Sequence, residues 1–140
     1  MTGNDVLLMA IQEAGGDVAD LPFWAGCREG RFLLHRCRIC ERWYWPASRC
    51  LQHGDQDMAW LDASGRGTIH TYTVMHHAYT PAMREKTPFA VAVVKLDEGP
   101  FFHTNILGCA AGDVHVGMTV EGVIEPAGQG LTLPMFRPAP

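Results

Sequence analysis

The chain has 140 residues, the size of one ordinary domain or of one domain with a small module attached. Apolar residues make up 47% and charged residues 19%, which excludes an intrinsically disordered chain. The net charge of −4 argues against a protein that mainly binds phosphate backbone, because such binding needs excess Lys and Arg. The apolar run at residues 6–11 fits neither a signal peptide nor a membrane span, so we expect a cytoplasmic protein.

Two short helices are predicted near the N-terminus. The first covers residues 5–14 and ends at a pair of glycines, and Asp20 can cap the second. The second helix carries an apolar stripe of Phe23, Trp24 and Cys27. These helices offer little to bury against each other. We therefore expect them to dock on the core of this chain, on a partner enzyme, or on a second copy in a homodimer.

Residues 31–56 are predicted to form a two-stranded ribbon with a cysteine knuckle at its tip. Cys37 and Cys40 are spaced as C-x-x-C, and Cys50 and His53 repeat that spacing. Each pair can present two ligand atoms from one tight turn, and structural zinc sites use four such sulfur and nitrogen ligands. Because four protein ligands leave no open position for water, we expect a structural zinc ion and not a catalytic one.

Three other interpretations of these four residues remain open. The C-x-x-C pair could be a redox dithiol, although no βαβ pattern surrounds it. The site could be degenerate and hold no metal, with His53 pointing elsewhere. The cysteines could also be ordinary buried thiols. A disulfide framework is not expected of five cysteines in a cytosolic chain.

The remainder of the chain is predicted to form a small antiparallel barrel. Five or six short strands alternate with glycine-marked turns, and the most apolar run, residues 89–96, should be central. The other strand segments are residues 58–64, 67–75, 100–108, 116–125 and 131–136. The expected division is a helical segment at 1–30, a ribbon at 31–56 and a barrel at 57–140.

The largest excursion from the barrel is a polar, proline-bearing loop at residues 76–87. One interpretation is a solvated loop, since many loops are polar for that reason alone. The other is a loop that faces a partner or the phosphates of a CoA ligand, because its cations can meet anionic groups. The candidate residues are His76, His77, Tyr79, Arg84 and Lys86.

Other chemistry is sparse. Cys109 would need His103 or His115 as a base to be a nucleophile, and a small buried residue is the simpler interpretation. The aromatic residues 43–45 can stack on a nucleobase or pack the ribbon onto the barrel. No glycine motif that cradles a phosphate is present. We therefore predict no thioester turnover by the isolated chain.

Several segments together resemble a known family. They are FWAGCREGRFLLHRCRIC (23–40), WYWP (43–46), SGRGTIHTYTV (64–74), PFAVAVVKLDEGPFFHTNI (88–106) and VGMTVE (116–121). With these the chain resembles the OB-fold proteins with a rubredoxin-like zinc ribbon, catalogued as domain of unknown function 35. The resemblance implies a mainly β fold of N-terminal helices, a zinc ribbon and a five-stranded OB-fold barrel. The usual ribbon has four cysteines in two pairs, often with a glycine after each pair. In this chain Glu41 occupies the position of such a glycine, and His53 occupies the position of the fourth cysteine.

The resemblance also implies a function. It implies a non-catalytic accessory subunit that binds a thiolase-like or other acyl-CoA-processing enzyme, supports the complex and contributes to an acyl-CoA site. The alternative is a module that binds single-stranded nucleic acid, since OB-folds and zinc ribbons both occur in such proteins. Six Arg and two Glu within residues 27–53 favour that alternative. Beyond residue 53, however, five basic residues face nine acidic ones, so a basic groove along the barrel is hard to build, and we favour the accessory subunit.

Overall fold

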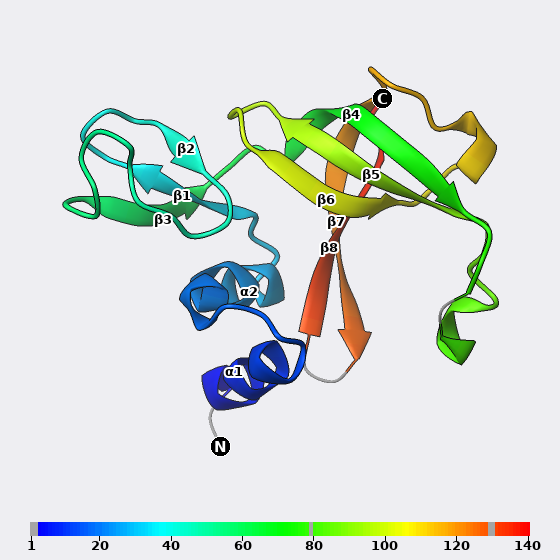
Figure 1. Cartoon of the computed structure of the whole chain (residues 1–140), viewed down its shortest axis with the longest axis horizontal. Coiled ribbons are helices and arrows are strands. Elements are labelled where there is room, and N and C mark those ends of the chain that lie inside the picture. The colour runs from blue at the N-terminus through cyan, green and yellow to red at the C-terminus, as the bar shows by residue number, and fades with distance from the viewer. Residues whose placement is uncertain (1–2, 79, 129–130) are drawn as a thin grey trace. The chain divides into compact units, whose positions relative to one another are not determined.

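The computed structural model describes residues 3–78, 80–128 and 131–140 and confirms a mainly β chain with helices at its N-terminus (Figure 1). The chain forms two compact units. The first unit comprises Met1–Ser64, Glu98–Pro100 and Ile124–Pro134, and the second comprises Gly65–Asp97, Phe101–Val123 and Met135–Pro140. The predicted boundaries at residues 30 and 56 are finer than this division and stay a prediction.

The helical part of the first unit consists of α1 (Gly3–Glu13), the 3₁₀ turn η1 (Val18–Asp20) and α2 (Leu21–Arg28). Helix α1 buries Leu7 and Ile11, which lie four residues apart on one face. Helix α2 buries Phe23 and Cys27, again four residues apart, at 0% and 1% exposure. The expectation that this stripe docks on a partner is wrong for these two residues, because the chain itself supplies the surface that covers them.

The three-stranded sheet of the ribbon follows the helices. Its strands are β1 (Leu33–Cys37), β2 (Trp43–Tyr44) and β3 (Met58–Asp62), in the order β2-β1-β3. We expected β3 among the barrel strands, but it pairs antiparallel with β1, from Leu33 opposite Asp62 to Cys37 opposite Met58. The reason is that β1 offers a second edge to pair, whereas the barrel closes on its other strands without β3.

The barrel confirms the five-stranded OB-fold expectation. Its strands close in the order β4-β5-β6-β8-β7. They are β4 (Arg66–Met75), β5 (Phe89–Leu96), β6 (Phe101–Ile106), β7 (Thr119–Gly128) and β8 (Leu131–Pro138). As predicted, the apolar strand β5 is an inner strand, and it pairs with β4 on one side and with β6 on the other (Figure 1). Its residues alternate in burial, and Ala90, Ala92, Val94 and Leu96 face the interior.

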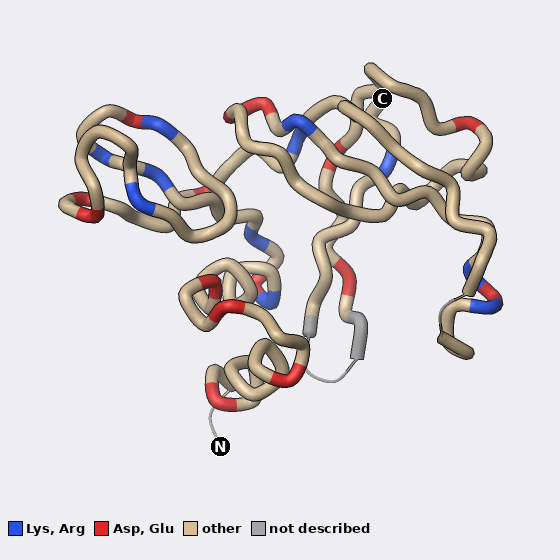
Figure 2. The backbone as a smooth tube through the Cα atoms, in the orientation of Figure 1, with Lys and Arg blue, Asp and Glu red and all other residues tan. Residues whose placement is uncertain are grey.

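Charge is unevenly distributed within the first unit. Asp and Glu mark its helices, whereas Arg recurs along the ribbon (Figure 2).

Among the described residues, none of the helices has the length and apolar character that a membrane span requires.

Candidate metal centre

The structure brings together the side chains of Cys37, Cys40, Cys50 and His53, and one ligand atom from each lies within 4.8 Å of the others. His53 Nδ1 lies 3.6 Å from Cys37 Sγ and 3.5 Å from Cys50 Sγ, and Cys40 Sγ lies 3.5 Å from Cys50 Sγ. A tetrahedral zinc ion bonded at about 2.3 Å to sulfur and about 2.0–2.1 Å to nitrogen would space these atoms by about 3.6–3.8 Å. The donor set therefore fits zinc, and these three distances lie close to the spacing of a tetrahedral site.

The first knuckle continues strand β1. The Glu41 N–H donates to the Cys37 carbonyl at 2.7 Å, and the Cys37 N–H donates to the Arg42 carbonyl at 3.0 Å, so the turn is closed by backbone bonds. Glu41 has a φ of 65°, in the left-handed region that favours glycine. Arg36 Nε donates to the Glu41 carbonyl at 3.0 Å and holds the strained residue in place. Glycine is thus replaced here at the cost of backbone strain.

The second knuckle lies outside the strands. Cys50 and Gly54 form an isolated bridge, in which each N–H donates to the carbonyl of the other residue, at 3.0 and 2.9 Å. Gly54 has a φ of 58°, nearly the value of Glu41 in the first knuckle. The two knuckles therefore repeat one backbone design, and the residue after the second ligand adopts a left-handed conformation in both. Only in the second knuckle is that residue glycine.

Hydrogen bonds to the Cys50 sulfur in the second knuckle favour its thiolate form. The Tyr44 hydroxyl hydrogen-bonds the Cys50 thiol and, with the N–H groups of Gln52 and His53, lowers the pKa of Cys50 to about 5. The Tyr44 oxygen also accepts the Leu51 N–H at 3.1 Å. Because the thiolate is the form that ligates metal, Cys50 is held close to the state that metal binding requires, whereas the pKa of Cys40 is raised. We did not anticipate from the sequence that Tyr44 would contact the candidate metal ligands, since no spacing rule links it to them.

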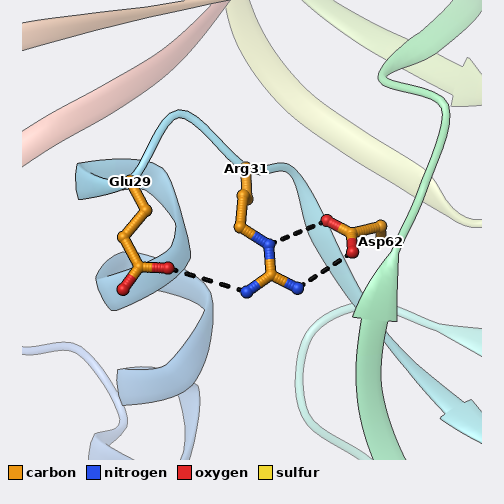
Figure 3. A network of polar contacts seen from close by, with 3 residues as sticks. All are labelled: Glu29, Arg31 and Asp62. Atoms are coloured by element: carbon orange, nitrogen blue, oxygen red, sulfur yellow. Dashed lines mark hydrogen bonds and ion pairs between the residues drawn. The ribbon is translucent and has the colours of Figure 1, made fainter.

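The arginines of the ribbon are largely engaged within the first unit. Arg31 makes a bidentate pair with Asp62, with bonds of 3.0 and 2.9 Å, and lies 3.6 Å from Glu29 (Figure 3). This pair lowers the pKa of the Asp62 carboxyl. Arg38 pairs with Asp57 at 3.0 Å, and Arg36 stacks over the Trp43 ring at 4.5 Å. These contacts reduce the free positive charge that a nucleic-acid site would need.

The aromatic residues 43–45 pack within their own unit. The Trp45 ring lies 4.1 Å from Phe23 and 6.4 Å from Trp60, measured between centroids. Trp45 thus packs on helix α2, and the expectation that these aromatics pack the ribbon onto the barrel stays a prediction.

The candidate loop residues lie between β4 and β5. His76, His77, Arg84 and Lys86 are exposed there, and Tyr79 lies outside the described residues. A short 3₁₀ turn, η2 (Pro81–Met83), interrupts the loop. The role of this loop in binding a partner or acyl-CoA stays a prediction.

The remaining thiols show no activation among the described residues. Burial raises the pKa of Cys27 to about 12. Burial and the nearby Asp113 carboxylate raise the pKa of Cys109, which is the opposite of what a nucleophile needs. His115 Nδ1 lies 3.3 Å from the Asp113 carbonyl oxygen, and His103 is exposed on β6. The structure thus describes no poised thiol outside the four-residue cluster.

Comparison with known proteins agrees with this architecture. A family model for the C-terminal OB-fold domain of ChsH2 matches residues 60–125. A probable enoyl-CoA hydratase alpha subunit of Thermomonospora curvata is 36% identical over 122 residues, 86% of this chain and 38% of that protein. The chain therefore spans well under half the length of that relative.

Two further matches cover most of both chains. A structure described as an Ltp2-ChsH2(DUF35) aldolase has a TM-score of 0.75 and 34% identity, and the match covers 84% of this chain and 92% of that one. A DUF35 domain-containing scaffold protein of Methanocaldococcus jannaschii is 32% identical over 105 residues, 71% of this chain and 72% of that protein. With this extent of similarity, and with the closed barrel and the ribbon cysteines in place, the chain belongs to the DUF35 family of OB-fold proteins.

Proposed function

We propose that the chain is an accessory subunit of an acyl-CoA-processing enzyme complex and that its partner is a thiolase-like enzyme. The observation that carries this proposal is the match over 92% of a chain in a structure described as an Ltp2-ChsH2(DUF35) aldolase. The relatives described as hydratase alpha subunits and as a scaffold protein support the same class of function. In this proposal the chain shapes and supports the complex, and the partner carries the reacting groups.

The residues of the chain are consistent with that division of labour. The thiols described outside the ribbon cluster have raised pKa values, so they are poor nucleophiles. Helix α1 buries one face, whereas Val6 and Met9 on its other side are exposed, as is Val18 in η1. We assign this exposed apolar face, which acidic residues flank, to contact with the partner enzyme. A homodimer through the same helices is the competing outcome.

The metal and the loop have supporting roles in the proposal. The Cys37, Cys40, Cys50 and His53 side chains hold a structural zinc ion, which stabilises the ribbon and takes no part in the reaction. The exposed cations Arg84 and Lys86 meet the phosphates of an acyl-CoA in the assembled complex.

The test is capture of the tagged chain from its source cell, followed by identification of partners and zinc analysis of the same sample. We expect an acyl-CoA-processing enzyme that turns over its thioester as a purified pair with this chain, and no turnover by this chain alone. Met9→Glu should abolish capture. The matched control is Val116→Glu, at another exposed apolar residue, and it should retain the partner.

Other results would contradict the proposal. Recovery of ribosomes or polymerase, together with tight and salt-sensitive binding of single-stranded DNA, would identify a nucleic-acid-binding module instead. A dimer of this chain that Met9→Glu dissociates, with no enzyme recovered, would assign the α1 face to self-association.

A further inference from the structure

Tyr44 is not a candidate metal ligand, yet its hydroxyl group touches the metal centre at two points. The oxygen accepts a hydrogen bond from the Leu51 N–H at 3.1 Å, and the hydroxyl also hydrogen-bonds Cys50 Sγ. Leu51 immediately follows Cys50, so both contacts fall on the second knuckle. Tyr44 itself belongs to strand β2, which pairs with β1 through His35 opposite Tyr44.

The hydroxyl group has one proton and can accept two hydrogen bonds. Because its oxygen already accepts the Leu51 N–H, the proton is left for the sulfur. Cys50 is only 4% exposed, so little water can supply such a donor. The Tyr44 hydroxyl is therefore a fixed donor that orients the Cys50 sulfur.

The second knuckle needs such an anchor more than the first. Cys37 ends β1, a strand that pairs with β2 on one edge and β3 on the other. Cys50 instead lies in an isolated two-residue bridge with Gly54. The Arg49–Asp55 pair beside it is exposed and 4.0 Å long, which contributes little. Tyr44 thus connects the second pair of ligands to the sheet that carries the first pair.

We propose that Tyr44 is a positioning residue of the metal centre, whose hydroxyl group holds the second knuckle against β2 and fixes the Cys50 sulfur as a ligand. This inference rests on the proposed zinc site. It goes beyond that site because it assigns retention of the metal to a residue that never contacts the ion. Outer groups that hydrogen-bond a ligand commonly change metal affinity by about 10–100-fold.

The test compares Tyr44→Phe with the parent chain and with Tyr72→Phe, a matched control on strand β4 of the barrel. Phenylalanine keeps the ring and removes only the hydroxyl group. The first measurement is the rate at which a chelator removes zinc from the full-length, zinc-loaded protein. We expect Tyr44→Phe to release zinc about 10–100-fold faster, and Tyr72→Phe to match the parent.

The second measurement is the absorption spectrum of the cobalt(II)-substituted protein. A hydrogen bond to a thiolate lowers the energy of its lone pairs, so removing it should move the sulfur-to-cobalt charge-transfer band to longer wavelength. A residue that only packs the ribbon would leave this band in place. Replacing Tyr44 by 3-fluorotyrosine makes the hydroxyl a stronger donor without disturbing the packing. It should shift the band to shorter wavelength and slow the release of zinc.

The outcomes are distinguishable. A parent chain that binds neither zinc nor cobalt would overturn the zinc site, and the role of Tyr44 with it. A parent that binds metal, with a Tyr44→Phe variant of unchanged release rate and unchanged band, would overturn the role of Tyr44 alone. Should Tyr44→Phe fail to fold, an unshifted band in the 3-fluorotyrosine protein would equally overturn that role.

Discussion

The ribbon and the barrel maintain their structures by different means. The barrel buries large apolar side chains from every strand around one interior, including Ile69, Val94, Val120 and Phe136 at no more than 1% exposure. At the knuckle end of the ribbon, the buried residues are Cys37 and Cys50. A closed barrel of this kind has enough apolar area to fold by burial, whereas two short knuckles do not. If the knuckles hold the proposed zinc ion, the comparison teaches that metal ligands can replace a hydrophobic core where the chain is too short to build one.

Metal removal should separate the two regions most strongly. Structural zinc contributes on the order of 10 kcal/mol to the folding of small zinc modules, so chelation should unfold the knuckles and leave the barrel intact. Hydrogen exchange measured by mass spectrometry should show lost protection in residues 37–54 and unchanged protection in β5. Cys37→Ser should mimic chelation, and Cys109→Ser should not. Equal loss of protection in both regions would show that the ribbon and the barrel unfold together.

A core substitution should produce the reverse pattern. Leu96 is buried in β5, and Leu96→Ala removes side-chain volume from the barrel interior at a cost of about 2–5 kcal/mol. We expect the barrel to unfold at a lower denaturant concentration, as followed by hydrogen exchange of its peptides. The zinc content of the protein should be unchanged. The control is Val116→Ala, at an exposed position, which should have little effect. Loss of zinc in Leu96→Ala would contradict the independence of the two regions.

The two knuckles offer a finer comparison. Glu41→Gly should stabilise the ribbon by about 1 kcal/mol, because glycine adopts the φ of 65° without the steric cost that other residues pay there. The ion pair with Arg36 that it removes is 3.7 Å long, and its Glu41 side chain is exposed, so its loss should matter little. Gly54→Ala should destabilise the ribbon by a similar amount, about 1 kcal/mol, although space is open around its Cβ position.

Tryptophan fluorescence can follow both variants, since all four tryptophans lie in the first unit. The measurement is the unfolding midpoint of the zinc-loaded protein in denaturant. Opposite shifts for Glu41→Gly and Gly54→Ala would support the shared left-handed design. Shifts of the same sign would mean that strain at these positions does not limit the stability of the ribbon.

The smallest effect is expected from the Arg31–Asp62 pair (Figure 3). Arg31 lowers the pKa of Asp62 below its value in the unfolded chain, so the pair stabilises the folded state above about pH 4. This contribution is lost as the pH falls through the lowered pKa of the folded state. Asp62→Asn should therefore flatten the acid limb of the stability profile slightly, since both side chains are exposed. The control is Asp97→Asn, in the turn after β5. If it changes the acid limb equally, the pH dependence does not come from the Arg31–Asp62 pair.

Local patterns in the sequence determined much of this protein. The spacing of Cys37, Cys40, Cys50 and His53 predicted two ligand pairs on two turns. Two residues that lie three apart in sequence can present both side chains from a single turn. The apolar run of β5 identified the central strand, and its alternating burial follows from the strand period of two. These features need only neighbouring residues, so they can be derived before any tertiary contact is known.

Contacts between distant segments were decided only by the tertiary structure. Strand β3 joined β1 and not the barrel, Trp45 packed on Phe23, and the Tyr44 hydroxyl reached Cys50. Each of these pairings depends on which free strand edge or ring face is available once the rest of the chain has folded. The residue types alone permit several partners, and burial and hydrogen-bond geometry select one of them.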